Sequence, residues 1–329
     1  MIAVTGASGF IGSAIVYELN LRGITDIHCV DILQEDDKWK NLVGLKFADY
    51  EEKDAFLKRI IFDDKFFKSK ITGIIHMGAC SSTTEKDSSF LIENNFKYTQ
   101  VLAKWCVRNS KRFVYASSAA TYGDGSAGFS DDHAGLDGLK PLNMYGYSKH
   151  LFDLWAQNNA LLDKIAGVKF FNVYGPNEYH KGEMRSVIHK AYGQIKETGK
   201  LKLFKSYKKE YPDGGQKRDF IYVKDAVNMT LNLYDSGRNG IYNTGTGKAR
   251  TWVDLGNAVF NAMGKKPDIE FIDMPEQIRE KYQYFTEAKM DKLLSNYGGK
   301  THSLEEGVSD YVKNYLAAGE KSLQEGGVA

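Results

Sequence analysis

Apolar residues along the chain form short continuous runs that alternate with longer stretches of helical periodicity. The short runs predict buried strands at Met1–Thr5, Ile27–Asp31, Gly73–His76, Arg112–Ala116 and Val168–Asn172. The stretches between them predict helices at Phe10–Leu21, Glu52–Phe62, Phe90–Arg108 and Tyr145–Leu162. Strands that are apolar throughout and alternate with helices are typical of a parallel sheet covered on both faces. We therefore expect an α/β fold with a Rossmann-like, doubly wound parallel sheet.

The pattern becomes less regular after Asn172. Further strands are expected at Phe220–Val223 and Gly240–Asn243, and amphipathic helices at Thr251–Met263 and Leu304–Leu316. The polar segment Tyr207–Lys217 contains a proline and a glycine pair and predicts an exposed loop, and the composition of Gly319–Ala329 predicts a frayed tail. We expect a nucleotide-binding domain of residues 1–171 plus about 219–247, and a smaller α/β substrate-binding lobe of residues 172–218 and about 248–329.

Length and composition narrow the class of protein. The chain has 329 residues, enough for a large core, and a formal net charge of +2, which gives no electrostatic reason to bind nucleic acid or an anionic membrane. No run approaches the roughly 20 apolar residues of a membrane-spanning helix, and the charge-free first segment is broken by glycines, unlike a signal peptide. Three cysteines without CxxC spacing and scattered histidines predict a reduced, cytoplasmic protein without a metal site.

A glycine-rich loop follows the first strand. The segment from Thr5 to Gly12 (TGASGFIG) has the form GxxGxxG and opens the first helix, as in loops that hold a pyrophosphate on helix N-terminal amides. Asp31 ends the second strand, where a carboxylate accepts hydrogen bonds from an adenosine ribose. A carboxylate there favours NAD, whereas Lys38 and Lys53 could reach a 2′-phosphate if their loops fold back. The residues alone leave NAD and NADP open.

A second motif supplies acid/base chemistry. Tyr145 and Lys149 form YxxxK, and positions i and i+4 share one face of a helix. The ammonium of Lys149 is expected to lower the pKa of Tyr145 from about 10 toward neutrality, which makes the phenol a usable general base. Ser118, at the carboxyl end of the preceding strand, is expected to lie beside them.

These motifs together resemble the extended short-chain dehydrogenase/reductase superfamily. The resemblance rests on the glycine loop, Asp31, the set Ser118, Tyr145 and Lys149, and two further motifs, Phe171–Pro176 (FNVYGP) and Arg218–Val223 (RDFIYV). More specific segments resemble the ADP-glyceromanno-heptose 6-epimerase family: Asn41–Val43, Ala48–Tyr50, Gly78–Glu85 (GACSSTTE), Ala116–Gly123 (ASSAATYG), His180–Gly182 (HKG) and Arg279–Thr286 (REKYQYFT). The second resemblance covers the chain nearly end to end.

The resemblance implies roles for individual residues. Tyr145 and Lys181 would be the two acid/base residues, with Ser118 and Lys149 completing the catalytic set. A tightly bound, recycled NADP would be held by Gly6, Gly9, Phe10, Ile11, Gly12, Asp31, Ile32, Lys38, Lys53, Met77, Gly78, Ala79, Cys80, Ser81, Asn94, Lys149, Val173 and Lys181. The nucleotide-sugar would be held by Asn172, Glu183, Lys190, Phe204, Lys205, Ser206, Tyr207, Arg218 and Tyr282. Glu183 stands where the family has a serine, and Lys190 aligns with a family histidine.

The implied reaction is epimerisation of ADP-D-glycero-β-D-manno-heptose at carbon 6, through transient oxidation to a 6-keto sugar. The resemblance further implies a homopentamer and a role in the inner core of bacterial lipopolysaccharide. A UDP-hexose 4-epimerase, or another nucleotide-sugar epimerase, is the alternative. A 4,6-dehydratase is disfavoured because alanines, not carboxylates, follow Ser118. A non-catalytic NADP-binding sensor is disfavoured because such proteins typically lose the tyrosine–lysine pair.

Overall fold

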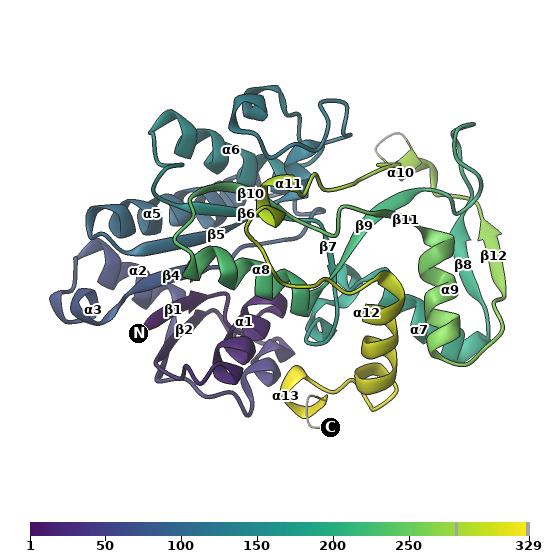
Figure 1. Ribbon diagram of the computed structural model, residues 1–329, viewed down its shortest axis with the longest axis horizontal. Coiled ribbons are helices and arrows are strands. Elements are labelled where there is room, and N and C mark those ends of the chain that lie inside the picture. Colours follow the sequence, from purple (N-terminus) through teal and green to yellow (C-terminus); the bar gives the residue numbers. More distant parts are fainter. Residues whose placement is uncertain (280–281, 327–329) are drawn as a thin grey trace.

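The computed structural model describes residues 1–279 and 282–326 and contains a seven-stranded sheet (Figure 1). Its strands are β1 (Ile2–Thr5), β2 (Ile27–Asp31), β3 (Asp49–Glu52), β4 (Gly73–His76), β5 (Arg112–Ser118), β6 (Ala166–Phe170) and β10 (Gly240–Thr244). They are ordered β10-β6-β5-β4-β1-β2-β3, and every neighbouring pair is parallel. This order reverses direction at β1, where ligands of doubly wound sheets bind.

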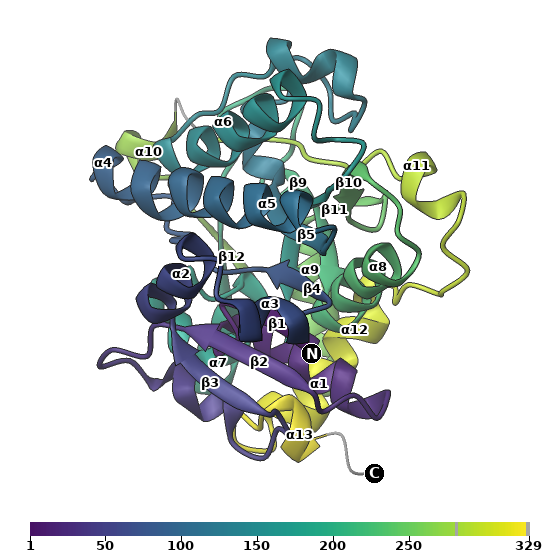
Figure 2. The same cartoon turned by 90° about the vertical axis from the view of Figure 1, so that its left-hand side faces the viewer.

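Helices cover both faces of this sheet (Figure 2). One face carries α2 (Lys53–Ile61), α3 (Lys65–Lys70), α5 (Tyr98–Arg108) and α6 (Met144–Asn158), and the other carries α1 (Phe10–Leu21) and α8 (Val223–Asp235). Short helical segments connect them: η1 (Asp37–Leu42), α4 (Ser88–Leu91), η2 (Ile92–Lys97), η3 (Ala119–Tyr122) and η4 (His133–Gly138). The predicted doubly wound α/β fold is confirmed.

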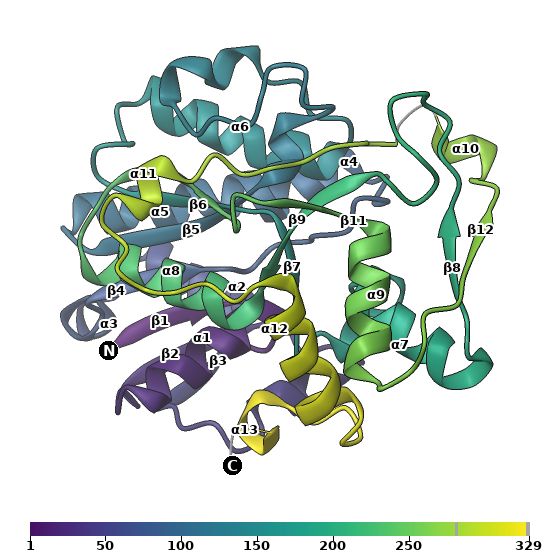
Figure 3. The ribbon, with the colours of Figure 1, turned by 45° about the vertical axis from the view of Figure 1, so that its right-hand side comes forward.

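A smaller group of elements lies beside the carboxyl ends of the strands (Figure 3). A three-stranded sheet of β7 (Asn172–Tyr174), β9 (Lys217–Tyr222) and β11 (Ala249–Thr251) leads to the parallel pair β8 (Leu201–Phe204) and β12 (Ile269–Ile272). The helical elements of this group are η5 (Tyr179–Met184), α7 (Val187–Thr198), α9 (Trp252–Ala262), α10 (Glu276–Arg279), α12 (Leu304–Asp310) and η6 (Tyr311–Leu316). The late helix α11 (Asp291–Leu294) packs instead on β10 of the large sheet, and α13 (Leu323–Gly326) packs on α1. The predicted boundaries between domain and lobe stay a prediction.

The apolar pattern located most of the central elements. The predicted limits of β2, β4 and α1 match the structure residue for residue. The predicted helix Phe90–Arg108 contains the π-helical segment η2 between α4 and α5. Strand β3 and helices α3, α7 and α8 were not predicted. Among the described residues, no helix is long and apolar enough to cross a membrane.

The prediction of a frayed tail from Gly319 onward is wrong for its described part. The side chain of Leu323 is 1% exposed, and its backbone N–H donates to Oδ1 of Asn177 over 2.9 Å. The hydroxyl of Tyr179 donates to the carbonyl of Lys321 over 2.7 Å. The tail is therefore anchored on the segment that follows β7. Residues 327–329 lie outside the described part of the chain.

Candidate active site

The glycine loop between β1 and α1 is shaped for a closely approaching ligand. Gly6 has a φ of +68°, and a Cβ at this position would lie 2.7 Å from the backbone nitrogen of Gly78. A Cβ on Gly12 would lie 1.9 Å from the carbonyl oxygen of Gly6. Only glycine fits both positions, and Gly9 caps the amino end of α1. The loop thus fits a pyrophosphate held by backbone amides and the helix dipole.

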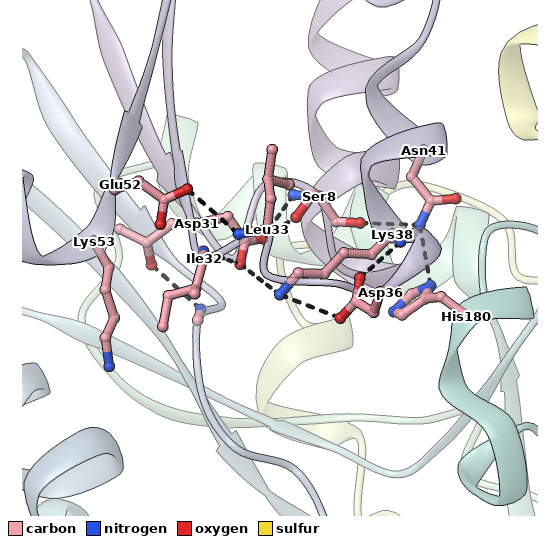
Figure 4. A network of polar contacts seen from close by, with 12 residues as sticks. Ser8, Asp31, Ile32, Leu33, Asp36, Lys38, Asn41, Glu52, Lys53 and His180 are labelled. Atoms are coloured by element: carbon pink, nitrogen blue, oxygen red, sulfur yellow. Dashed lines mark hydrogen bonds and ion pairs between the residues drawn. The ribbon is translucent and has the colours of Figure 1, made fainter.

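Asp31, at the end of β2, is surrounded by donors from the chain itself (Figure 4). Its Oδ2 accepts hydrogen bonds from the backbone N–H and the hydroxyl of Ser8. Its Oδ1 accepts from the backbone N–H of Ile32 over 2.7 Å and from Nζ of Lys38 over 3.1 Å. Lys38 therefore compensates the charge of Asp31 at the edge where the sequence predicts an adenosine ribose.

Lys53 begins α2 on the other side of Asp31 in the close-up view (Figure 4). Its Nζ donates to Oδ1 of Asn94 over 2.6 Å. The neighbouring Asn95 accepts from the backbone N–H of Cys80 and donates to the carbonyl of Cys80, each over 2.9 Å. Lys53, Asn94 and Cys80 thus belong to one network that links α2, η2 and the turn after β4.

A single cavity of about 520 Å³ joins most of the predicted cofactor and catalytic residues. The predicted residues that line it are Gly6, Gly9, Phe10, Ile11, Gly12, Asp31, Lys38, Met77, Gly78, Ala79, Ser81, Ser118, Tyr145, Lys149, Asn172, Val173 and Lys181. The predicted residues outside its lining are Ile32, Lys53, Cys80, Asn94, Glu183, Lys190, Phe204, Lys205, Ser206, Tyr207, Arg218 and Tyr282. The cavity lies at the carboxyl ends of the parallel strands, as expected for a doubly wound fold.

Ser118, Tyr145 and Lys149 lie at the junction of β5 and α6. All three line the cavity, and Nζ of Lys149 donates to the carbonyl of Ala116 over 2.8 Å. Burial raises the pKa of Tyr145, and the neighbouring Ser118 hydroxyl opposes this shift. Burial also lowers the pKa of Lys149 to about 8. The expectation that Lys149 lowers the pKa of Tyr145 is therefore wrong for this structure, because Lys149 is bonded to the strand backbone and desolvation of the phenol dominates.

Lys181 reaches the same cavity from η5. Its Nζ lies over the ring of Phe10, 5.2 Å from the ring centroid. Burial lowers the pKa of Lys181, and the charge of Glu178 opposes this effect. Glu178 is 1% exposed and accepts hydrogen bonds from Ser186 and from the hydroxyl of Tyr311. The segment that carries Lys181 is thus fixed to α7 and η6.

Arg218 lies in an aromatic cluster next to the cavity. Its guanidinium carbon is 5.7 Å from the ring centroid of Trp252 and 5.5 Å from that of Tyr282. The indole nitrogen of Trp252 donates to the hydroxyl of Tyr282 over 3.0 Å, and the ring of Phe204 contacts that of Tyr282. Trp252 also lines the cavity, so the cluster continues from it. Aromatic rings beside a buried arginine suit a planar base and a phosphate.

The remaining predicted substrate residues lie toward the surface. Glu183 and Lys190 form an exposed ion pair, with 3.0 Å between Oε2 and Nζ. Lys205 and Tyr207 both donate to Oδ1 of Asp273 over 3.2 Å. The backbone N–H of Ser206 donates to Asp213. These residues are not brought to the cavity.

The NAD dependent epimerase/dehydratase family matches residues 2–245. This match agrees with a cavity lined by the glycine loop and by the pair Tyr145 and Lys149. The chain belongs to this family. It is 57% identical over 325 residues to an ADP-L-glycero-D-manno-heptose-6-epimerase of Nitratidesulfovibrio vulgaris, covering 98% of this chain and 100% of the relative. The resemblance to the ADP-glyceromanno-heptose 6-epimerases is thus confirmed, as is the expectation of an isomerase.

Solved structures of the family share its fold. An ADP-L-glycero-D-manno-heptose-6-epimerase of Helicobacter pylori has a TM-score of 0.78 at 22% identity, covering 94% of each chain. The UDP-glucose 4-epimerase of Thermus thermophilus in complex with NAD has a TM-score of 0.71 at 24% identity, covering 94% of this chain and 97% of the other. A nicotinamide cofactor is a property of this family.

Several residues that line the cavity were not identified as site residues from the sequence of this epimerase/dehydratase family member. His180 and Arg185 line the cavity beside Lys181, and Trp252 lines it beside Phe220. His180 is part of the HKG motif, so the motif carried a usable signal for this residue. Trp252 begins α9, about 70 residues after Lys181, and no local pattern connects it to the site. Glu280 and Lys281, within the REKYQYFT motif, lie outside the described residues.

Proposed function

We propose that this chain epimerises ADP-D-glycero-β-D-manno-heptose at carbon 6 to the L-glycero form, with an NADP that stays bound between turnovers. One observation carries the proposal: a single cavity holds the glycine loop, Tyr145, Lys149 and Lys181. It occurs in a chain that is 57% identical, nearly end to end, to a protein named for this activity.

Carbon 6 carries a secondary alcohol whose C–H bond is not acidic, so direct proton abstraction is disfavoured. The chemistry that a bound oxidised nicotinamide supplies is reversible acceptance of a hydride from this carbon. Loss of the hydride and of the hydroxyl proton gives a planar 6-keto sugar. After this ketone turns its other face, return of the same hydride inverts the centre.

Tyr145 and Lys181 are the two groups proposed to move the hydroxyl proton. The raised pKa of Tyr145 favours the phenol, which can donate a proton to the carbonyl oxygen. The lowered pKa of Lys181 increases the fraction of neutral amine, which can accept the proton of the alcohol. Reversal of both roles gives the opposite direction, with Ser118 beside Tyr145 in the cavity lining in each.

The contacts of Asp31 support NADP over NAD. An uncompensated carboxylate repels a 2′-phosphate, but Asp31 is neutralised by Lys38 and accepts two hydrogen bonds from Ser8. Lys53, which lies outside the cavity lining on the other side of Asp31 (Figure 4), then adds a further positive charge next to this end of the cavity. We propose that both ammonium groups face the 2′-phosphate, with Asn94 orienting Lys53.

The aromatic cluster around Arg218 is proposed to receive the ADP end of the substrate. Trp252 lines the cavity, and Tyr282 and Phe204 extend the cluster away from it. Burial lowers the pKa of Arg218, but a guanidinium remains charged at neutral pH. Asn172, in the cavity lining, would contact the heptose.

The assembly and cellular role are further proposals. We propose a homo-oligomer, a homopentamer in accordance with the family resemblance, whose mass light scattering would measure. The unpaired thiols of Cys29, Cys80 and Cys106 support a reducing compartment, the cytoplasm. The role there would be to supply activated heptose for lipopolysaccharide core.

The experiment is proton NMR of purified protein with ADP-D-glycero-β-D-manno-heptose and no added nucleotide. Conversion to the L-glycero epimer supports both the substrate and a recycled cofactor. Parallel reactions contain UDP-glucose and UDP-galactose. Turnover of a UDP-hexose without turnover of the heptose would replace the proposal with a 4-epimerase.

A further inference from the structure

A fully buried ion pair lies behind the catalytic residues. The side chains of Asp153, on α6, and Lys169, on β6, are both 0% exposed, with 3.5 Å between Oδ2 and Nζ. Neither residue belongs to the cavity lining, so neither is placed to contact a substrate. Taking two charges out of water costs free energy that their attraction often fails to recover. Stabilisation of the fold is therefore a poor explanation for this ion pair, and a role in the function of the site is to be considered.

Asp153 and Lys149 together connect α6 to three consecutive residues of β5. Its Oδ1 accepts from the hydroxyl of Tyr115 over 2.9 Å, and its Oδ2 accepts from the hydroxyl of Ser117 over 2.7 Å. Ala116, between them, accepts from Nζ of Lys149 over 2.8 Å. Lys149 and Asp153 are four positions apart and share one helix face. Three bonds thus fix the register between this face and the strand end.

Lys169 restrains Ser118, the last residue of β5, through Thr121. Its Nζ donates to Oγ1 of Thr121 over 2.8 Å, and the hydroxyl of Thr121 donates to the carbonyl oxygen of Ser118 over 2.8 Å. The ammonium also lies 4.5 Å from the ring centroid of Tyr122. Ser118 is therefore held from one side through Ser117 and Asp153, and from the other through Thr121 and Lys169.

We propose that Asp153, with Lys169 as its counter-ion, is a positioning residue for the reaction. It holds the strand end that carries Ser118 against the helix face that carries Tyr145 and Lys149, and its carboxylate favours the charged form of Lys149. The inference rests on the proposed function for its kinetic consequence, but not for its effect on Lys149.

The groups around Lys149 determine the direction of the expected pH effect. Asp153 faces it from α6, and its charge opposes the loss of the positive charge of Lys149. The Cys80 thiol faces it from the turn after β4 and His76 from β4 as a buried imidazole, and Lys169 lies behind Asp153 as the counter-ion of the carboxylate. Tyr145 lies one turn before Lys149 on α6. Removal of the Asp153 charge is therefore expected to let Lys149 lose its proton at lower pH.

The main test is the double variant Asp153→Asn/Lys169→Met, which removes both charges and leaves no unpaired ion. We expect kcat to fall about 10- to 100-fold with KM changed less than about threefold, because misplacement of catalytic groups by about 1 Å costs rate rather than binding. The alkaline limb of the kcat profile should move to lower pH, because Asp153 is a charge that favours protonated Lys149. NMR titration of ¹³C-labelled lysine, with the Lys149 signal assigned from Lys149→Arg, should show the same shift without substrate.

Tyr115→Phe is the second variant, in case the double variant fails to fold. It removes the hydrogen bond from the Tyr115 hydroxyl to Asp153. The charge of the carboxylate is then less offset by a neighbouring O–H dipole, so the titration of Lys149 should move up. Opposite shifts in the two variants are not expected from loss of stability alone. A general packing defect would move the Lys149 titration of both variants in one direction, or would move neither.

The matched control is Asp310→Asn/Lys224→Met, at two residues that do not line the cavity. Asp310 likewise accepts from a tyrosine, Tyr222, over 2.8 Å and from Lys224 over 2.7 Å. This variant should keep the wild-type kcat and the wild-type titration of Lys149.

Unchanged kcat and unchanged Lys149 titration in a folded Asp153 variant would overturn the inference. Absence of heptose turnover in the wild-type protein would instead refute the proposed function. The Lys149 titration would then still decide the role of Asp153.

Discussion

A variant of Lys38 gives the most direct test of the proposed preference for NADP over NAD. The Lys38 ammonium lies 3.1 Å from Oδ1 of Asp31, and its side chain is 16% exposed. Replacement of Lys38 by alanine is expected to weaken the binding of a 2′-phosphate in two ways. The proposed direct charge contact is lost, and the carboxylate of Asp31 is left without its cationic partner.

The size of the effect follows from the strength of hydrogen bonds to charged groups. Such a bond contributes about 1.5–3 kcal/mol, which corresponds to about 10- to 100-fold in binding. We expect Lys38→Ala to lower the preference for NADP over NAD by at least this factor. NAD, which has a free 2′-hydroxyl, should lose much less.

Cofactor-depleted protein is incubated with equal concentrations of NADP and NAD, freed of unbound nucleotide and denatured. Mass spectrometry then gives the ratio of the two released nucleotides. Lys40→Ala is the matched control, because Lys40 lies on the same segment, η1, but is 60% exposed and paired with Asp37. An NADP preference in Lys38→Ala that stays within twofold of the control would refute the reasoning.

Three further predictions concern the catalytic residues and the core. Tyr145→Phe removes the phenolic proton and should lower kcat about 10²- to 10⁴-fold with unchanged thermal unfolding; wild-type turnover would exclude the assignment. Lys181→Met should abolish epimerisation while the cofactor remains bound, and loss of the cofactor would make Lys181 a binding residue instead. Burial lowers the pKa of His76 to about 3 from 6.5, so the unfolded chain binds an extra proton between these values. The free energy of unfolding should therefore fall as pH decreases from 6.5, by up to about 1.4 kcal/mol per unit. Urea unfolding of His76→Gln should show a shallower pH dependence, and an equal slope would contradict this view of His76.

Local sequence patterns were sufficient to predict the elements that form the nucleotide-binding side of the site. The limits of β2 and α1 were predicted correctly because continuous apolar runs and a glycine loop are encoded within a few residues of each other. The pair Tyr145 and Lys149 could be placed on one helix face for the same reason. Helix α8 was missed because its asparagines, threonine and valines have low helical propensity, and burial against the sheet overrides this.

Contacts between distant segments could not be predicted from such patterns. Leu323 is anchored by Asn177, 146 positions earlier, so a tail of unremarkable composition becomes ordered. The pKa of Tyr145 was predicted in the wrong direction because the sequence does not show that Lys149 donates to Ala116. Nothing local pairs Asp153 with Lys169 either, since the two lie on different elements.

The central claim is that inversion proceeds by hydride removal and return rather than by exchange of a proton with solvent. The most direct test is to epimerise ADP-D-glycero-β-D-manno-heptose in D₂O and record the carbon 6 proton of the product by NMR. The account predicts full conversion to the equilibrium mixture with the carbon 6 proton retained. Deuterium at carbon 6 of the product would contradict it.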